Sequence, residues 1–558
     1  MMQTTEREDQ PDEEVIRKMI APFRSRRFAS FPGQVWLKLL TSITPKPVPD
    51  LWDLQAPITS LISLQPEFVA LMQSIHGMDH LKIIQECQST IFLEGTNSNV
   101  VHLILRRLIN TDVALELALI SLRRAYLQFV LHQPASVEPQ HMQTMITIAS
   151  QAFNNEYVFF ETAEEDEMCK GLIACEEPED CDAFPFVAKV VAHAMYHPLH
   201  SLSLSERQMQ ILTQHGEYVQ ELIDRQTKDS AIERNIAANM PSFHQIENEI
   251  SKRVRQQYEA APYPRWLDID FPERREFSAY IKGKFPFLHD VPKVGTLHCL
   301  IAGCGTGRHA IYVASKFWDC SVVAIDLSRR SLAYGVHQAS RYGISNIEFA
   351  HGDILKVSEL KRDFDLIEAV GSLHHMEDAV SGIQALTEVL RPGGFMKIAI
   401  YRRSYRDRLK PARDFTWNRL RTYTTSELQS IRHDLITQES IDIETAKDAR
   451  DFYYTSGFRD LLGHVQELSF TPLEIKAMLQ KLNLQFLGID YADVPAIKTA
   501  FREAYPDERS SRDLDVYEVF EASHTEQMSS LITFWVRKPL FAATQAGTGQ
   551  SPVDPVHG

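Results

Sequence analysis

Short apolar runs alternate with helical stretches in the second half of the chain, and this alternation constrains the fold more than any other feature. Five such runs follow residue 294: TLHCLIA, SVVAID, IEFAHGD, FDLIEAV and FMKIAIY. A helical stretch between two short strands brings the second strand back parallel to the first. Two later runs, LQFLGID and LITFWVRKP, can complete the sheet. Residues 294–540 are therefore predicted to form an α/β domain with a doubly wound, mostly parallel seven-stranded sheet.

The first half of the chain has the periodicity of helices. In VVHLILRRLINTDVALELALISLRRAYLQFVL, apolar residues recur at spacings of three and four, and Asp112 is a plausible helix start. The segments MQTMITIASQAFNNEYVFF and FPFVAKVVAHAMYHPLHSL predict further helices, the second one stopped by Pro198. The leucines that can share one helical face in the first segment are Leu103, Leu108, Leu115, Leu119 and Leu122. No repeat of about 34 residues, the period of a helical repeat array, is evident.

Polar and Pro-rich stretches divide the chain further. The predicted order is a disordered leader (1–14), an all-helical domain (15–225), a linker and lid segment (226–293), the α/β domain (294–540) with a helical insertion at about 403–467, and a disordered tail (541–558).

A glycine-rich loop follows the first predicted strand, in LHCLIAGCGTGRHAIYVA. Gly303, Gly305 and Gly307 allow a tight turn and the close approach of a ligand to the backbone. The helix that begins near Arg308 adds free N–H groups, which suit a pyrophosphate or a carboxylate. A dinucleotide loop has the spacing G-x-G-x-x-G, whereas Arg308 occupies the position of its third glycine here. The spacing therefore disfavours nicotinamide and flavin dinucleotides.

Two carboxylates follow the next two strands. Asp326 ends SVVAID, where a carboxylate can accept hydrogen bonds from both hydroxyls of a ribose. Asp353 follows the third strand in FAHGDIL, where it can accept from an adenine amino group. Ligands of open α/β sheets bind at the carboxyl ends of the strands, so the loop and both carboxylates predict a nucleoside site there.

These motifs resemble the class I S-adenosylmethionine-dependent methyltransferase family. The matching segments are AGCGTG, VVAIDLS, HGDIL, FDLIEAVGSLHHM and LTEVLRPGGFMKIAIY. The resemblance implies a Rossmann-like fold and S-adenosyl-L-methionine as the cofactor. VRQQYEAAPYPRW and SGFRDLLGHVQELSFTPLEIKAML also resemble bacterial methyltransferases with an N-terminal helical domain.

The resemblance also implies roles for single residues. The methionine moiety would lie along Gly303, Cys304, Gly305 and Gly307. Asp326 would bind the ribose, Leu327 would pack on the adenine, and Asp353 and Ile354 would flank it. Gly371 and Ser372 would face the sulfonium and the acceptor. The sequence departs from the family at Ile301, where many members carry an acidic residue that holds the methionine ammonium.

Methyl transfer from a sulfonium is an in-line displacement, so the protein mainly aligns the nucleophile. A base is needed only where the nucleophile carries a proton. His374 and His375 are the candidate bases, although one could cap a helix and the other pack or face solvent. Tyr401 ends the fifth strand and either binds the acceptor or anchors the rim. His464 and Glu467 are weaker candidates for the mouth of the site.

Aromatic residues before the sheet are candidates for a lid. Tyr258, Tyr263 and Trp266 could cover the cofactor, since aromatic faces attract cations, and Arg265 could bind a carboxylate. Plain packing explains the same segment equally well. A basic run lies after the fifth strand and either meets an anionic substrate or, as is more common, forms a solvated face. It comprises Arg402, Arg403, Arg406, Arg408, Lys410 and Arg413.

Composition reduces the classes of binding partner that we expect for this chain. The formal net charge of −16 disfavours nucleic acid, and the absence of any long apolar run disfavours a membrane span. Seven cysteines without a CxxC pair predict no metal site, and with the polar N-terminus they favour the cytoplasm. The predicted function is methyl transfer to a small-molecule or protein acceptor. The alternatives are a non-catalytic scaffold with a degenerate fold, which Ile301 favours, and an RNA methyltransferase, which the basic run favours. The sequence leaves the oligomeric state undetermined.

Overall fold

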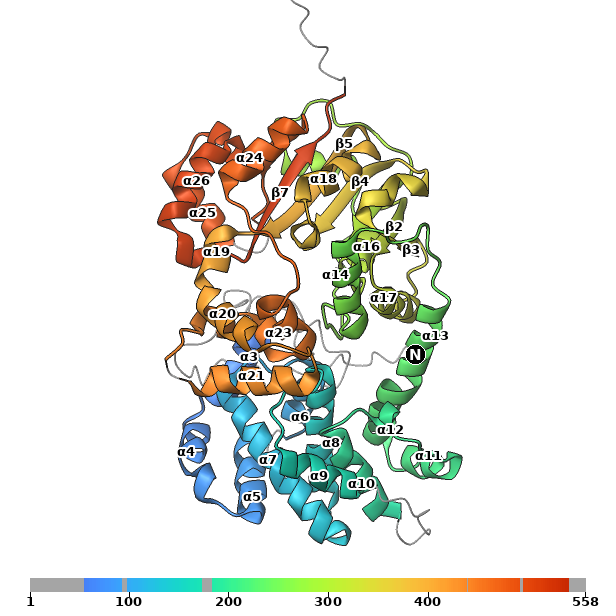
Figure 1. Ribbon diagram of the computed structural model, residues 1–558, viewed down its shortest axis with the longest axis vertical. Helices are drawn as coiled ribbons and strands as arrows, with labels where there is room; N and C mark the ends of the chain where they lie inside the picture. The colour runs from blue at the N-terminus through green and yellow to red at the C-terminus, as the bar shows by residue number, and fades with distance from the viewer. Residues whose placement is uncertain (1–54, 93–97, 173–182, 439, 492–494, 541–558) are drawn as a thin grey trace, which may run out of the picture.

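The computed structural model describes residues 55–92, 98–172, 183–438, 440–491 and 495–540. The predicted leader and tail lie outside these residues. A helical half and a sheet half stand at opposite ends of the molecule, with a second group of helices between them (Figure 1). In the described part of the chain, no helix is both long and apolar enough to span a membrane.

The helical half is built around one hydrophobic core. Asp112 caps α7 by accepting a hydrogen bond from the backbone N–H of Leu115, as its position predicts. Four of the five predicted leucines are buried in the core, and Leu103 packs against it partly buried. The helices are α3 (Gln55–Ser63), α4 (Pro66–Ser74), α5 (His80–Ile91), α6 (Ser98–Arg107), α7 (Val113–His132), α8 (Pro139–Asn154), α9 (Ala163–Leu172), α10 (Ala183–Ala194), α11 (Glu206–Thr213) and α12 (Glu217–Ile223).

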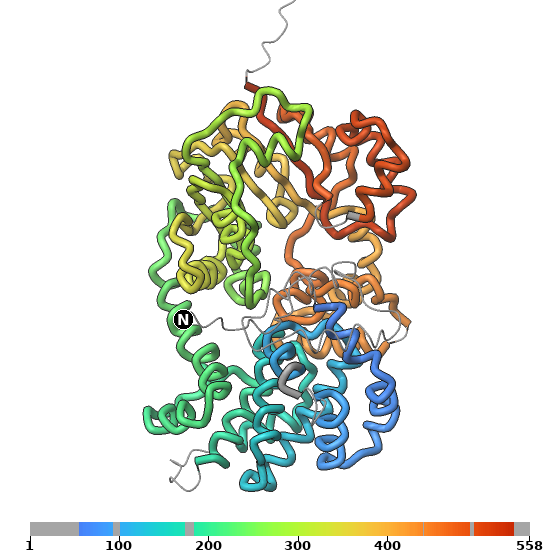
Figure 2. Tube along the Cα trace, turned by 180° about the vertical axis from the view of Figure 1, so that it is seen from behind, coloured from blue at the N-terminus to red at the C-terminus, as the bar shows by residue number. Residues whose placement is uncertain are grey.

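Three helices follow before the sheet: α13 (Asp229–Ala238), α14 (Glu249–Ala260) and α15 (Phe277–Lys284). The view from behind shows α13 climbing one side of the molecule from the helical half to the sheet half (Figure 2). The segment between α14 and α15 contains the predicted lid aromatics Tyr263 and Trp266.

The sheet has seven strands in the order β3-β2-β1-β4-β5-β7-β6. All neighbours are parallel except β7, which runs antiparallel to β5 and to β6. This confirms the doubly wound, mostly parallel, Rossmann-like sheet. The strands are β1 (Leu297–Ala302), β2 (Cys320–Asp326), β3 (Ile347–His351), β4 (Phe364–Val370), β5 (Leu390–Tyr401), β6 (Gln485–Ile489) and β7 (Leu531–Arg537).

Helices cover both faces of the sheet, and a separate hydrophobic core lies on each side. The strand order reverses between β1 and β4, so the loops after these strands diverge and leave a crevice at the carboxyl edge. The covering helices are α16 (Arg308–Lys316), α17 (Arg329–Arg341), α18 (Ala379–Glu388), α24 (Pro472–Lys481), α25 (Pro495–Ala504) and α26 (Leu514–Ser523).

The insertion after β5 folds as helices with a core of their own, and Ile109 of the helical half belongs to that core. Polar contacts add to this packing: Gln429 donates to the carbonyl of Tyr157 at 2.6 Å, and Thr455 donates to the carbonyl of Glu156 at 2.7 Å. The insertion therefore bridges the helical half and the carboxyl edge of the sheet. Its helices are α19 (Arg403–Arg408), α20 (Lys410–Arg419), α21 (Thr425–Thr437), α22 (Glu444–Asp448) and α23 (Thr455–Leu462).

Candidate active site

The glycine loop between β1 and α16 has the backbone that its sequence predicts. Gly303, Gly305 and Gly307 have φ values of +74°, +52° and +83°, a region that other residues rarely adopt. A Cβ at Gly303 would overlap the side chain of Ser372, and one at Gly305 would overlap the carbonyl oxygen of Tyr263. The loop therefore lies between the end of β4 and the lid segment, and only glycine fits at these two positions.

Asp326 points at the glycine loop from the tip of β2. Its Oδ2 accepts a hydrogen bond from the backbone N–H of Gly305 at 2.8 Å, and its Oδ1 accepts from that of Ser328 at 2.8 Å. A carboxylate has about four acceptor positions, and Leu327 also contributes a backbone hydrogen bond, so at least one position remains for a ligand. Burial raises the pKa of Asp326 to about 6, which leaves it largely ionised at neutral pH.

Asp353 is buried beside β3 and caps the turn that follows by accepting from the backbone N–H of Leu355 at 3.0 Å. The backbone N–H of Asp353 donates to Nε2 of His244 at 2.7 Å. A Cβ at Gly352 would overlap the ring of Phe243. Phe243 and His244 thus wall this end of the crevice, and the sequence analysis did not single them out because they lie in the linker, far from the motifs.

Ile301 is buried in β1, next to Glu368 in the register of β4. Glu368 already accepts from Nε2 of His309 at 2.7 Å and lies 3.9 Å from the ammonium of Lys397. Lys397 and His309 overcome the effect of burial and lower the pKa of Glu368 to about 2. The carboxylate next to Ile301 is therefore present but already paired with Lys397 and bonded to His309.

Gly371 and Ser372 follow β4 at the same edge of the sheet. Gly371 has a φ of +79°, and a Cβ there would meet nothing within 4 Å, so open space lies beside it. Ser372 donates to the carbonyl of Ala302 at 2.9 Å, which ties the end of β4 to the end of β1. The crevice is thus closed around the loop and open at Gly371.

The lid segment packs directly on the glycine loop. The backbone N–H of Thr306 donates to the carbonyl of Tyr263 at 3.1 Å, and the indole N–H of Trp266 donates to the carbonyl of Thr306 at 3.2 Å. The hydroxyl of Tyr263 reaches Asp451 of the insertion at 3.3 Å. Trp266 is therefore a buried packing residue, whereas Tyr263 spans from the loop to the insertion.

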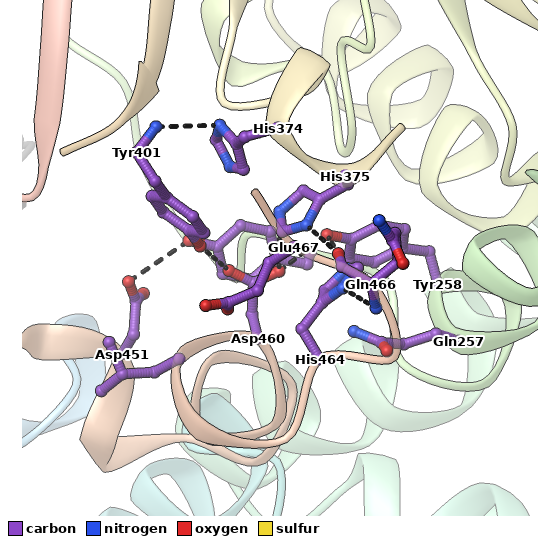
Figure 3. Close-up of polar contacts among 12 residues, drawn as sticks. Gln257, Tyr258, His374, His375, Tyr401, Asp451, Asp460, His464, Gln466 and Glu467 are labelled. Atoms are coloured by element: carbon purple, nitrogen blue, oxygen red, sulfur yellow. Dashed lines mark hydrogen bonds and ion pairs between the residues drawn. The ribbon is translucent and has the colours of Figure 1, made fainter. Parts of the chain in front are cut away.

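A buried polar network lies at the mouth of the crevice (Figure 3). Asp460, on α23, is 2% exposed and accepts from the hydroxyl of Tyr258 at 2.7 Å and from that of Tyr401 at 2.9 Å. Its partners come from α14 and from the end of β5, so three distant segments meet at one carboxylate. Burial raises the pKa of Asp460 to about 6. The sequence analysis missed Asp460. Because α23 ends at Leu462, two residues before His464, no helical spacing relates the two residues.

Hydrogen bonds assign the tautomers of the three histidines in this network. Nδ1 of His464 accepts from the backbone N–H of Gln466 at 3.0 Å, so Nε2 carries the proton and lies 3.1 Å from the hydroxyl of Tyr258. Nδ1 of His374 accepts from the backbone N–H of Tyr401 at 3.3 Å, so its Nε2 is also protonated.

His375 has the opposite tautomer. Its Nδ1 lies 2.9 Å from the carbonyl of Gln466 and must donate, so Nε2 carries the lone pair. That Nε2 is 3.8 Å from Oδ1 of Asp460, longer than a hydrogen bond. Burial lowers the pKa of His375 to about 4 and holds the pKa of His374 and His464 well below the usual value. All three rings are neutral at pH 7, and only His375 presents an acceptor nitrogen toward the carboxylate.

His375, Asp460 and His464 also have the mutual spacing of a metal site, since one donor atom of each lies within 4.8 Å of the others. The tautomers argue for another use. The Nε2 of His464 carries its proton because Nδ1 is occupied by a backbone N–H, and a protonated nitrogen is not a ligand. The arrangement favours a chain of proton donors and acceptors.

The basic run after β5 is not the solvated face that the sequence suggested. Arg402 pairs with Glu521, Arg403 with Glu474 at 2.9 Å, and both Arg406 and Arg413 with Glu467. The guanidinium of Arg406 also lies over the ring of Tyr401 at 4.5 Å. These four arginines hold the insertion against the sheet, and Glu467 neutralises two of them. Of the other two cations of the run, Arg408 bonds only to backbone carbonyls and Lys410 is exposed beside Asp414.

Comparison with known proteins shows which families and enzymes parts of this chain resemble. Residues 300–394 match a family of methyltransferase domains. An uncharacterized protein of Synechococcus is 25% identical over 263 residues, 45% of this chain and 63% of that protein. The trans-aconitate 2-methyltransferase of Deinococcus radiodurans is 31% identical over 129 residues, 23% of this chain and 43% of that enzyme. The chain thus spans less than two thirds of the length of either relative.

Among solved structures, PKMT2 of Rickettsia typhi aligns with 49% of this chain and 54% of its own, at 16% identity and a TM-score of 0.36. At that score the alignment adds nothing to the sheet topology described above.

Proposed function

Because this chain contains a class I methyltransferase domain, we propose that it transfers the methyl group of S-adenosylmethionine to a small-molecule acceptor. The observation that carries the proposal is the bond between Asp326 and the Gly305 N–H. It places a carboxylate with spare acceptor positions against a glycine loop at the switch point of the sheet, where a nucleoside joined to an amino acid fits.

The residues along the crevice fit this cofactor. Asp326 would hold the ribose hydroxyls, Asp353 and Ile354 the adenine with Leu327 packed on it, and the glycine loop with Cys304 the methionine moiety. Gly371 would leave room for the sulfonium. When bound, the cofactor supplies an electrophilic methyl group, and the chain's own residues position and deprotonate the acceptor.

His375 is the proposed base. Its Nε2 has a lone pair and no protein hydrogen, so it can take a proton from an acceptor hydroxyl. The carboxylate of Asp460 would then stabilise the imidazolium across the 3.8 Å separation. Tyr401 and Tyr258 fix that carboxylate, and His374 and His464 orient the two tyrosines.

Enclosure of this network supports a small acceptor over a polypeptide. His375 is 5% exposed and Asp460 2%, and Tyr258 of α14 bonds to Asp460 of α23 beside His375 (Figure 3). The trans-aconitate and phosphoethanolamine methyltransferases among the relatives are named for small substrates, which agrees with this choice. The basic run, paired with glutamates, gives no support to RNA as the acceptor.

Calorimetry with S-adenosylhomocysteine tests the cofactor site. The wild-type chain should bind it in the micromolar range, Asp326→Ala should abolish the heat, and the exposed control Asp363→Ala should bind like wild type. Incubation of a cell extract with methyl-labelled cofactor should then put label in the small-molecule fraction. No heat from the wild-type chain would favour a scaffold, and label confined to protein or RNA would overturn the proposed acceptor class.

A further inference from the structure

A polar cavity lies where the helical half meets α13, α17 and the lid segment, away from the methyl-transfer crevice. Its volume is about 60 Å³, on a scale where one water molecule needs roughly 10–15 Å³. Figure 1 shows α12 and α13 running from the helical half to the side of α17, and residues of all three helices line the cavity. Its lining includes Arg106, Arg107, Arg225, Arg265 and Arg341.

Four of these five arginines form no ion pair within the described part of the chain. Arg107 lies 3.6 Å from Asp268, whereas Arg106, Arg225, Arg265 and Arg341 have no carboxylate within 4 Å. Arg265 instead lies over the rings of Phe153 and Tyr334, at 4.9 and 5.5 Å. Carboxylates act on them only from beyond 4 Å, as Glu156 does on Arg265 and Glu221 on Arg225. Guanidinium groups that line one cavity repel one another, and a bound anion would reduce that repulsion.

Arg106 gives the clearest sign of a missing partner. It is 6% exposed, and its Nη1 is buried with no hydrogen-bond partner. Its Nε donates to the carbonyl of His102 at 3.3 Å, and its guanidinium lies 3.6 Å above the ring of Tyr218, so the group is held in place. Nε of Arg265 is also buried without a partner. Buried donors of a charged group are rarely left unbonded.

The carboxylates in the lining do not supply these partners. Asp229 and Glu233 face His337, at 3.8 and 3.3 Å, and Asp268 faces Arg107. Glu221 stands exposed at the rim. Burial and the nearby Arg265 lower the pKa of Arg225, and Glu221, which acts in the opposite direction, does not cancel them.

We propose that this cavity binds a compact anion with phosphate or carboxylate groups, held by Arg106, Arg225, Arg265 and Arg341. The planar guanidinium fork matches the oxygens of either group, which is why arginine serves such sites. Arg265 is contributed by the lid segment and Arg106 and Arg225 by the helical half, so the anion would sit between the two. The site is separate from the cofactor crevice, and its existence does not depend on the proposed methyl transfer.

Titration calorimetry of the full chain with inorganic phosphate and, separately, with malonate tests the site, at ionic strength held constant with chloride. We expect saturable binding of one anion per chain. Arg265→Gln should weaken it at least about tenfold, since a lost charge-assisted hydrogen bond costs roughly 1.5 kcal/mol or more. Arg341→Gln, on the exposed end of α17, should weaken it as well and tests the site even if Arg265→Gln fails to fold.

Arg362→Gln is the matched control, because it removes one exposed arginine that pairs with Glu348 outside the cavity. It should bind phosphate and malonate like wild type. Binding of phosphate alone would assign a phosphate-bearing ligand, and binding of malonate alone a dicarboxylate. The proposal is overturned if the wild-type chain binds neither anion at about 10 mM, or if the cavity variants bind as tightly as the control.

Discussion

The guanidinium of Arg432 donates one hydrogen bond from each terminal nitrogen to the carboxylate of Glu116, at 2.5 and 2.7 Å. The two side chains are 2% and 3% exposed, respectively, and their residues are 316 positions apart in the chain. The pair joins α21 of the insertion to α7 of the helical half. Since the insertion also supplies Asp460, the position of that carboxylate depends on a contact far from the sheet.

Breaking this ion pair should therefore be costly. Glu116→Gln leaves the Arg432 charge buried without its counter-ion, and we expect a loss of about 3–5 kcal/mol in the free energy of unfolding. Urea denaturation followed by circular dichroism measures it. The exposed pair of Arg362 and Glu348 is the control, and Glu348→Gln should cost less than about 1 kcal/mol. Equal, small losses in both variants would mean that the buried pair does not hold the insertion.

Substitution of His375 should separate catalysis from cofactor binding. His375→Gln removes the acceptor nitrogen, so we expect turnover to fall by about 10²–10⁴-fold, with the affinity for S-adenosylhomocysteine unchanged. His464→Gln is the matched comparison, because His464 is equally buried but has its Nδ1 occupied by the Gln466 N–H. It should slow turnover less. A smaller effect for His375→Gln than for His464→Gln would remove His375 as the base.

Substitution of Asp460 should raise the free energy of unfolding and lower turnover. Its pKa is raised from 3.8 to about 6 by burial, so ionisation at pH 7 opposes folding. Asp460→Asn removes that charge. A rise of about two pKa units corresponds to ~3 kcal/mol, so we expect the free energy of unfolding at pH 7 to rise by up to about 3 kcal/mol, while turnover falls about tenfold or more.

The pH dependence of that gain provides a check. The wild-type cost is present above pH 6 and fades as the pH falls toward 3.8, where the carboxyl is protonated in both states. Denaturation midpoints of Asp460→Asn and wild type should therefore approach each other from pH 6 downward and converge near pH 3.8. Destabilisation of the variant at every pH would show that the hydrogen bonds to Tyr258 and Tyr401 outweigh the buried charge.

Local signals explain how much of the fold was predictable. The strands are short apolar runs and the glycine loop needs positive φ, both properties of neighbouring residues, so the sheet and the helical half could be predicted. Asp326 was placed correctly at the tip of β2, facing the loop. Its binding role, with those of Asp353, Gly371, His374 and Tyr401, stays a prediction.

Contacts between distant segments were not predictable. Tyr258 and Asp460 are 202 positions apart, and no periodicity relates α14 to α23. The basic run looked solvated because its glutamate partners lie 54 to 119 positions further along the chain. The cavity arginines come from four separate segments of the chain, so only the three-dimensional structure shows that they line one cavity.

Buried histidines should govern the stability of the chain in mild acid. Burial lowers their pKa below the value of 6.5 in the unfolded chain, so the unfolded state binds more protons, and stability present above pH 6.5 is lost as the pH falls toward 4. The groups with lowered pKa are His102 at about 3, His193, His351 and His375 at about 4, His374 and His464 well below 6.5, and His200 below 6.5. The groups whose pKa is raised oppose them but are fewer: Glu156, Asp229, Asp326, Asp460 and His337. We expect the urea midpoint to fall steadily from pH 7 to pH 4.5.

His464→Gln should make the fall shallower, and the exposed His76→Gln should not. A midpoint that rises in acid would mean that the carboxylates dominate.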